Sequence, residues 1–438
     1  MTRTSIFILA IMTWNLSSFA QESMTLFQAI QTGLENNYSI IIEKNNAAIA
    51  KNNNTIGNAG FLPVITGTAT QNNTVTNTHQ QKFDGTTNDI SNAKNTSLNA
   101  GAQMTWTLFD GFSMFVNKNM LSVLQEMGET QARAIIDSTV AAIILNYYGI
   151  VQQQKMIQVL RDAVDLSLQR VKISEAKVSL GAGSQLDLLQ SKVDLNADST
   201  SLILELAAVQ ATKADLNNLL ARKPEIPFIV VDTINLSYRI TYDSLLAKSQ
   251  QQNTDLLLAR NNVDLSKLDL KNLRSERYPK LNFNAGYTYS QLSSQTGFLQ
   301  SSRNYGPAYG FTATYTLFDG FNVNRSIHNA KIAMNSSEIQ FKEVDLYVQS
   351  VLFKLWLDYT SNLQIVNLQT INQEVARENV DVAFEKYRLG SISDIDLRET
   401  QKKYIDAQYQ LILSQFQAKQ AEIQLQRVSG ELFKSLGN

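Results

Sequence analysis

The chain has 438 residues, with 38 basic and 39 acidic side chains, two histidines and no cysteine. Charges this evenly balanced, without long runs of one sign, argue against a nucleic-acid-binding surface. Disulfides are excluded, and two histidines leave little for a zinc site or a histidine-based catalytic triad. The sequence shows no nucleophile–base pair, metal-ligand spacing or cofactor fingerprint, so we expect neither an enzyme nor a bound cofactor.

Residues 1–20 have the pattern of a secretory signal peptide. Arg3 precedes an apolar run over 6–12, and Ser18-Phe19-Ala20 places small residues where signal peptidase reads them. We expect cleavage before Gln21 and export of the mature chain. No later stretch comes near eighteen uninterrupted apolar residues, so a membrane-spanning helix is not expected.

The mature chain contains an internal sequence repeat. The hexapeptide TLFDGF occurs at 107–112 and again at 316–321, an offset of 209 (316 minus 107). Other pairs share this offset or one of 216: Gly181/Gly390 and Asp187/Asp396 at 209, and Pro63/Pro279 and Asn37/Asn253 at 216. The sequence therefore predicts a tandem duplication with one loop indel, with repeats over 21–230 and 231–438.

Each repeat is predicted to open with a helix, over 24–58 and 242–276, followed by a β-hairpin. The hairpins lie at about 61–110 and about 279–319. Apolar residues alternate with polar ones there, as over 98–108 and 309–317, which is typical of strands with one apolar face. Strands of ten to twelve residues are long enough to cross a bilayer in a barrel. A soluble two-layer sandwich would show the same alternation.

The TLFDGF motif stands where each outgoing strand is predicted to become a long helix. Asp110 and Asp319 can cap the new helix, and Gly111 and Gly320 allow the chain to bend. The aromatic rings of the motif, which include Phe109 and Phe318, suit a membrane–water boundary.

Long helical hairpins are predicted over 112–222 and 321–435. No proline interrupts the helical run of either hairpin, and apolar residues recur at alternating strides of three and four, as expected of coiled-coil packing. The first arm alone measures roughly 100 Å at about 1.5 Å per residue. Gly181 and Gly390 end the first arms, and Ser184 and Ser393 can cap the second arms, so each hairpin turns at its tip.

The predicted fold is mainly α with membrane β. Two β-hairpins supply four strands per chain, and an open four-stranded sheet leaves unpaired edges that lipid does not tolerate. Other copies must complete a barrel. Two chains would supply eight strands and three would supply twelve, and strand counting does not decide between these numbers.

Taken together, these features resemble the TolC-like outer membrane efflux proteins over essentially the whole mature chain. The duplicated plan, both TLFDGF motifs and the segment 387–399 (YRLGSISDIDLRE) carry the resemblance. It implies a homotrimer with a twelve-stranded barrel in the outer membrane of a Gram-negative bacterium and an α-helical tunnel across the periplasm. It also implies partners, namely a periplasmic adaptor (membrane fusion) protein and an inner-membrane pump.

The resemblance also implies a gate at the periplasmic tip. Asp396 and Glu399, with Asp187 in the first hairpin, match carboxylates that line a constricted entrance. Tyr387 matches a tyrosine that helps to hold the entrance shut. Ile392 and Leu186 replace polar residues found in some relatives, and Arg388 could substitute for the lost polar lock.

A simpler interpretation of the two aspartates is helix capping. Ser184-x-x-Asp187 and Ser393-x-x-Asp396 both resemble capping boxes. Glu399 lies three residues after Asp396 on the same helix face, and capping does not require it. Copies around a symmetry axis would form acidic rings, which favour cations.

The function implied by the resemblance is that of an outer-membrane channel of a tripartite export system, passing drugs, metal ions or secreted protein. Type I protein secretion specifically is one alternative, and a structural or adhesive coiled-coil envelope protein is another. The sequence does not name the exported substrate or the type of pump.

Overall fold

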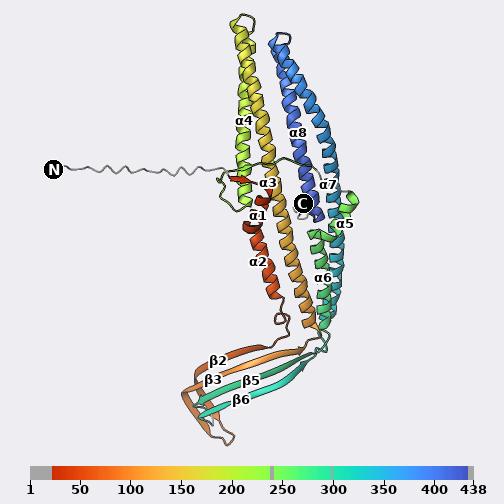
Figure 1. Ribbon diagram of the computed structural model, residues 1–438. Coiled ribbons are helices and arrows are strands. Elements are labelled where there is room, and N and C mark those ends of the chain that lie inside the picture. The colour runs from red at the N-terminus through yellow and green to blue at the C-terminus, as the bar shows by residue number, and fades with distance from the viewer. Residues whose placement is uncertain (1–21, 237–240, 297–298, 433–438) are drawn as a thin grey trace, which may run out of the picture.

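The structure is a computed structural model that describes residues 22–236, 241–296 and 299–432. The predicted signal peptide, residues 1–20, lies outside the described residues. The molecule is elongated, with two helical hairpins at one end and a four-stranded sheet at the other (Figure 1). The elements of the first repeat are β1 (Glu22–Met24), α1 (Leu26–Asn36), α2 (Tyr38–Asn53), β2 (Val64–Gln81), β3 (Thr87–Phe109), α3 (Ser113–Ser179) and α4 (Gln185–Leu219). Those of the second are β4 (Phe228–Val230), α5 (Tyr242–Gln252), α6 (Thr254–Ser275), β5 (Lys280–Ser294), β6 (Ser301–Thr314), α7 (Asn322–Arg388) and α8 (Asp394–Ser429).

Helix boundaries follow the duplication. The first arms of the two hairpins, α3 and α7, both have 67 residues, and their first residues are 209 apart (322 minus 113). The opening helices α1 and α5 both have 11 residues and begin 216 apart (242 minus 26). The prediction of two long antiparallel helical hairpins is confirmed. The second hairpin ends earlier than the predicted residue 435, because Gly430 takes the left-handed conformation and caps α8 after Ser429.

The single opening helix predicted for each repeat is wrong, since each is divided in two. Asn37 separates α1 from α2 and Asn253 separates α5 from α6, both in an extended conformation with ψ of 124°. Each Asn side chain accepts a hydrogen bond from the N–H three residues on, which caps the second helix. Each side-chain amide also donates to a carbonyl at the end of the hairpin's second arm, Leu219 or Val428. A duplicated asparagine therefore ties each opening helix pair to its hairpin.

The sheet is antiparallel, with strand order β2-β3-β5-β6. Its strands have 14 to 23 residues, longer than the predicted ten to twelve, because polar Asn- and Thr-rich stretches continue the pairing outward. Pairing registers put apolar side chains on one face, including Trp106, Phe283 and Phe311 across three strands. The other face carries mainly polar or small residues, such as Gln103 opposite Gly286. One face suits lipid and the other suits water.

Both strand-to-helix junctions have the same backbone. Gly111 and Phe112 have φ of 72° and 71°, and Gly320 and Phe321 have φ of 69° and 66°, so two consecutive left-handed residues turn each strand into a helix. The Asp110 carboxylate accepts a hydrogen bond from the N–H of Met114 at 2.9 Å, and Asp319 accepts one from Val323 at 2.6 Å. The ring of Phe109 meets that of Phe112 edge to face, and Phe318 meets Phe321 in the same way.

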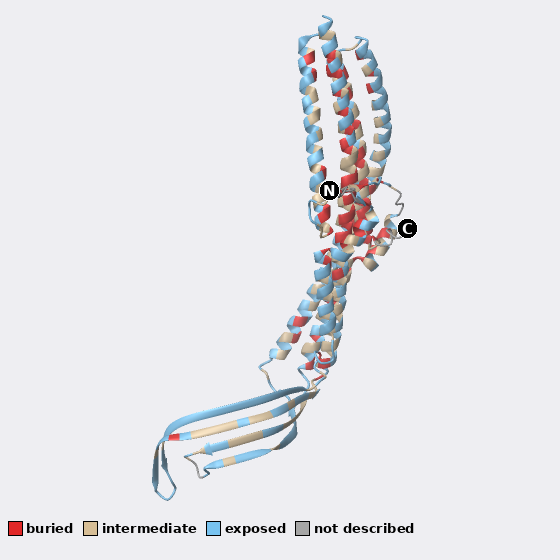
Figure 2. Ribbon diagram, turned by 60° about the vertical axis from the view of Figure 1, so that its left-hand side comes forward, coloured by how far each residue is buried: buried red, intermediate tan, exposed pale blue. Residues whose placement is uncertain are grey.

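The largest apolar core lies midway along the helices, where the buried residues of Figure 2 concentrate. The segment 140–151 of α3 supplies much of it, packed against α1, the end of α4 and the short parallel pair β1–β4. By length and composition, α3 contains a window apolar enough to cross a membrane, contrary to the expectation from the sequence. More than half of that window is buried in this core, as expected of a core helix.

Candidate functional site

The tips of the two hairpins are built by the same turn. Gly181 and Gly390 adopt left-handed φ values of 68° and 76°, a conformation that a side chain would strain. Ser184 and Ser393 then cap α4 and α8 through their hydroxyls. Only the second tip has a full capping box. There Asp396 accepts hydrogen bonds from the N–H and the hydroxyl of Ser393, whereas Ser184 caps the N–H of Leu186.

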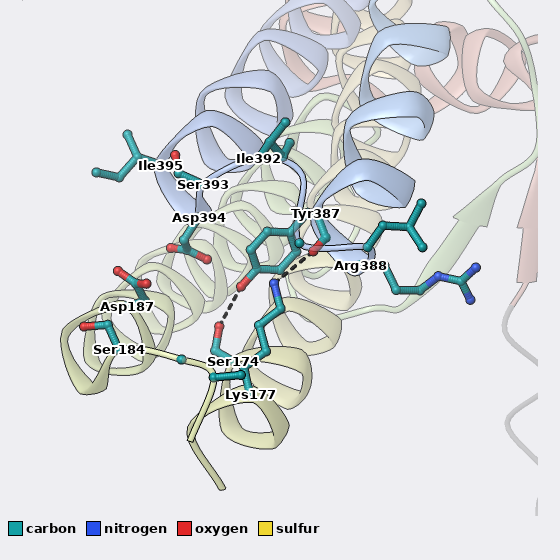
Figure 3. Close-up of a pocket in the computed structure, with 14 residues that line it drawn as sticks. Ser174, Lys177, Ser184, Asp187, Tyr387, Arg388, Ile392, Ser393, Asp394 and Ile395 are labelled. Atoms are coloured by element: carbon teal, nitrogen blue, oxygen red, sulfur yellow. Dashed lines mark hydrogen bonds between the residues drawn. The ribbon is translucent and has the colours of Figure 1, made fainter. Parts of the chain in front are cut away.

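The three predicted gate carboxylates lie on the surface of the tips. The hydrogen bond from the Ser393 hydroxyl holds the pKa of exposed Asp396 below its usual value. Glu399 is also exposed and pairs with Lys403 of its own helix at 2.7 Å. Asp187 is partly buried and lines a pocket of about 430 Å³ between the two tips (Figure 3). Asp187 and Glu399 also border a second hollow nearby.

Tyr387 joins the two hairpins within one chain. Its side chain is buried, and its hydroxyl shares a hydrogen bond of 2.9 Å with the Ser174 hydroxyl of α3 (Figure 3). The ammonium of Lys177 lies 3.7 Å from the centre of the Tyr387 ring and donates to the Tyr387 carbonyl at 2.9 Å. Burial raises the pKa of the Tyr387 hydroxyl, so this contact is made by the neutral phenol. Arg388, by contrast, is exposed and pairs with Glu385 one turn earlier on α7.

A buried charge cluster, which sequence reasoning missed, lies below Tyr387. Arg170 of α3 is fully buried and donates to Asp394 of α8 at 2.9 Å and to Asp194 of α4 at 2.6 Å. Arg398 of α8 makes two hydrogen bonds of 2.8 Å to Asp198 of α4. We call these five residues the tip clamp. It connects three helices of both hairpins in one chain.

Neighbouring carboxylates offset the cost of burying Arg398. Burial opposes the charge on Arg398, but its hydrogen bonds to Asp198 and the attraction of Asp194 and Asp394 outweigh burial and raise the pKa of Arg398. Paired and hydrogen-bonded in this way, buried charges fix the helices in one arrangement and become costly when one partner is lost.

The sequence contains a signal that points to Arg170. Buried residues of α3 recur at strides of three and four through Met156, Val159, Ala163, Ser167, Arg170 and Ser174. A charged residue in register with an apolar seam predicts a buried ion pair. Its partners were not predictable in this way, because they lie on other helices.

The arrangement holds helices together and offers no metal centre. Within residues 22–236, 241–296 and 299–432, no group of three or more His, Asp or Glu side chains is placed to hold a metal ion. The tips present surface carboxylates, the Tyr387 contact between the two hairpins and the buried tip clamp.

Comparison with solved structures identifies the fold. The outer-membrane channel OprN superposes with a TM-score of 0.77 at 16% sequence identity, over 93% of this chain and 90% of that one. The outer membrane protein VceC from Vibrio cholerae gives 0.75 at 14% identity, over 92% and 96%. The CmeC outer membrane channel of Campylobacter jejuni gives 0.75 at 14% identity, over 93% and 86%. No curated protein sequence matches the chain.

The sequence itself matches one protein family, described as outer membrane efflux protein. The match covers residues 29–222 and 245–431, which are the two repeats from α1 to α4 and from α5 to the end of α8. The chain therefore belongs to the outer membrane efflux protein family, whose members are channels of the outer membrane of Gram-negative bacteria.

Proposed function

We propose that three copies of the chain form an outer-membrane channel and periplasmic tunnel for a tripartite export system. The observation that carries this proposal is a four-stranded sheet with two unpaired edge strands, β2 and β6, attached to helices of 67 residues. Unpaired edges are not stable in lipid, so other copies must close the barrel. Helices of this length, at about 1.5 Å per residue, reach roughly 100 Å from the barrel.

Partners follow from the same geometry. A channel supplies a passage and not the energy for export, so a separate pump must drive transport. A tunnel reaching into the periplasm suits docking to an adaptor protein and an inner-membrane pump. The MtrE outer membrane channel of Neisseria gonorrhoeae, which has the same fold, has been solved in its open state, and we extend opening and closing to this chain.

The test is reconstitution. In fractionated cells the protein should sediment with outer membranes. After purification it should migrate as a trimer in mild detergent and conduct ions in planar bilayers. A soluble monomer after signal cleavage would refute the channel. Type I protein secretion uses the same kind of passage, and a genomic neighbour encoding an ATP-driven transporter rather than a proton-driven pump would favour it. A purely adhesive coiled coil would not conduct.

We also propose that the tips form the gate. Copies of Asp396, Glu399 and Asp187 would surround the entrance, and Tyr387 would hold each chain's hairpins together in the closed state. Glu399 supports a role beyond capping, since it is exposed and pairs with a surface lysine of its own helix, Lys403. Carboxylate rings in a narrow opening attract cations.

The gate is tested by Asp396→Asn combined with Glu399→Gln. The double variant should assemble normally, lose cation preference and become less sensitive to divalent-ion block from the periplasmic side. Glu175→Gln is the control, because Glu175 is an exposed α3 carboxylate that also pairs with a lysine, Lys192. Unchanged selectivity and block in the double variant would reduce Asp396 and Glu399 to helix stabilisation.

A further inference from the structure

One pair of contacting side chains differs between the two repeats at the place where the helices meet the sheet. In the first repeat, the ring of Phe61 meets the ring of Phe115 edge to face at 5.0 Å. The duplication relates these residues to Arg277 and Asn324, at offsets of 216 (277 minus 61) and 209 (324 minus 115). There the Arg277 guanidinium donates to the Asn324 side-chain oxygen at 2.7 Å. The same contact is therefore aromatic in one repeat and cationic in the other.

This contact lies at the margin of the apolar face of the sheet. Trp106 belongs to that face, and its indole N–H donates to the carbonyl of Phe61 at 2.9 Å. Phe115 is 55% exposed, and its ring contacts that of Phe112 at 6.3 Å. Exposed rings at this height are typical of a membrane–water boundary. In the second repeat α6 and α7 run side by side down to the sheet (Figure 1), which places Arg277 at the height of lipid headgroups.

A second cation accompanies Arg277. Arg274 lies in the last turn of α6, and its carbonyl accepts a hydrogen bond from the N–H of Arg277 at 3.3 Å, so the two side chains follow each other at helical spacing. Both arginines are exposed, and neither forms an ion pair with another residue that the structure describes. One acid, Glu276, stands between them. The copies of Arg274 and Arg277 in the first repeat, Asn58 and Phe61, are uncharged.

Apolar rings lie next to this cationic pair. Phe321 directly precedes α7, whose third residue is Asn324, and its ring meets that of Phe318 edge to face at 5.4 Å. The two phenylalanines are 68% and 73% exposed. The second repeat thus combines two arginines with uncovered aromatic rings at the edge of an apolar sheet face.

We propose that Arg274 and Arg277 bind the phosphate of an anionic phospholipid headgroup, while the acyl chains of that lipid lie on the exposed rings and the apolar face of the sheet. A guanidinium matches a phosphate with two parallel hydrogen bonds, and cations at a membrane surface attract anionic lipids. The Asn324 contact holds one of the two guanidinium groups in place. This inference rests on the proposed channel, because the sheet must lie in the membrane, and it goes beyond it by assigning a lipid site.

A membrane lipid accounts for more of the site than a soluble phosphate does. A free phosphate would use the two arginines and leave the rings of Phe318 and Phe321 exposed to water. A phospholipid uses both parts, since its headgroup is charged and its chains are apolar. In a trimer, three cationic junctions of this kind would alternate with three neutral ones built around Phe61 and Phe115.

Trp106 reports lipid contact at this level of the sheet. The chain has three tryptophans, of which Trp14 lies in the predicted signal peptide and Trp356 lies on α7 in the helical section. Trp106 pairs across strands with Phe283 of β5, the strand that follows Arg277. Brominated acyl chains quench tryptophan fluorescence on contact. In phosphatidylcholine vesicles, brominated phosphatidylglycerol should quench Trp106 with an apparent binding constant about three- to tenfold that of brominated phosphatidylcholine.

Two matched double variants test the arginines. Arg274→Gln with Arg277→Gln should lower the preference for phosphatidylglycerol to below about twofold, because the charge that attracts the headgroup is gone. Arg161→Gln with Arg377→Gln is the control, since it removes two exposed arginines of α3 and α7 that lie roughly 70 Å or more along the helices from the sheet. The control should keep the preference of the parent protein.

A third variant transfers the site to the other repeat. Phe61→Arg with Phe115→Asn copies the pair of the second repeat beside Trp106 and should raise the preference for phosphatidylglycerol by about a further twofold. An added soluble headgroup, sn-glycerol 3-phosphate, should not displace the brominated lipid from the parent protein. Displacement would identify a soluble phosphate ester as the ligand and overturn the lipid assignment.

Failure of this site can be told apart from failure of the channel. Equal quenching by the two lipids in the parent protein, or an unchanged preference in Arg274→Gln with Arg277→Gln, would overturn the headgroup site, and the channel would stand if the protein still conducts ions. If the parent protein does not conduct and neither lipid quenches Trp106, the proposed channel is wrong as well. Loss of the preference in that variant, with the Arg161 and Arg377 control unchanged, supports the lipid site.

Discussion

The two repeats can be compared position by position, in their middle and at their tips. In the middle, Asn37 and Asn253 make the same pair of contacts, a cap on the following helix and a hydrogen bond to the carbonyl of Leu219 or Val428. At the tips the turns still match, but the buried charged residues do not. The duplication relates Arg170 to Asn379 and Asp394 to Gln185, which cannot form an ion pair.

This difference separates two kinds of residue. Features that every repeat needs in order to fold have been retained in both copies, as the caps and left-handed turns show. The tip clamp serves only the contact between the two hairpins inside the chain, so its charges occur once. At the corresponding level of the chain's outer edges the duplication places neutral Asn379 and Gln185, and Lys403 takes the place of Asp194. Hairpins of one chain should therefore stay together while neighbouring chains separate at the tips.

The largest expected effect comes from breaking the tip clamp. Arg170→Met leaves Asp194 and Asp394 without their buried partner and should cost about 3–5 kcal/mol of local stability. Asn379→Met alters the corresponding, exposed position of the second repeat and should stay within about 0.5 kcal/mol. Hydrogen exchange at residues 167–180 and 390–401 of the detergent-solubilised protein measures both. Equal effects of the two changes would remove the distinction between the clamped inner contact and the outer edges.

How much of this could be predicted from the sequence depends on whether a feature is local. The duplication, the turns at Gly181 and Gly390 and the Asp110 and Asp319 caps each depend on a few neighbouring residues. The break at Asn37 was missed, although its pairing with Asn253 was visible. An asparagine inside a helical pattern is tolerated, and its role comes from a carbonyl 182 residues away.

The tip clamp and the strand lengths were missed for related reasons. Arg170 is in register with an apolar seam, but its partners Asp194 and Asp394 are 24 and 224 residues away. The strands extend beyond their apolar part through polar residues such as Asn88 opposite Gln80, which carry no apolar alternation. Pairing between strands, rather than local pattern, determines where they end.

The second-largest expected effect concerns the duplicated asparagines, Asn37 and Asn253. Asn37→Ala and Asn253→Ala each remove a helix cap and a buried hydrogen bond to a carbonyl, and each should cost about 1–3 kcal/mol. Since the two sites lie in different repeats, the double variant should lose about the sum. Denaturant unfolding followed by circular dichroism measures this loss. A large effect at one site with none at the other would show that the repeats do not use this device equally.

A smaller effect is expected at the strand-to-helix junctions. Asp110→Ala and Asp319→Ala each remove a side-chain cap from a long helix and should cost about 0.5–2 kcal/mol. Because the backbone is the same at both junctions, the two costs should agree. Hydrogen exchange of the first turns of α3 and α7 provides the measurement. A clear inequality would indicate that the neighbouring chain contributes to one junction.

The smallest effect concerns the capping box that only the second tip completes. The hydrogen bond from Ser393 lowers the pKa of Asp396 in the folded chain. A lowered folded-state pKa means that the carboxylate stabilises the start of α8 above the usual aspartate pKa of 3.8, and that this contribution is lost as the pH falls through the lower folded value. In the unaltered protein, exchange protection at 394–400 should therefore decrease at acid pH.

Asp396→Ala should remove that acid-dependent step, because protection would already be reduced at neutral pH. Asp187→Ala is the matched control: Ser184 caps the N–H of Leu186 without the aspartate, so the pH profile of α8 should not change. If the step persists in Asp396→Ala, another acid near the tip controls the stability of α8. Comparing these profiles with the bilayer recordings of the Asp396 and Glu399 double variant then separates helix stabilisation from conduction, since capping acts within one chain and an acidic ring requires the assembled channel.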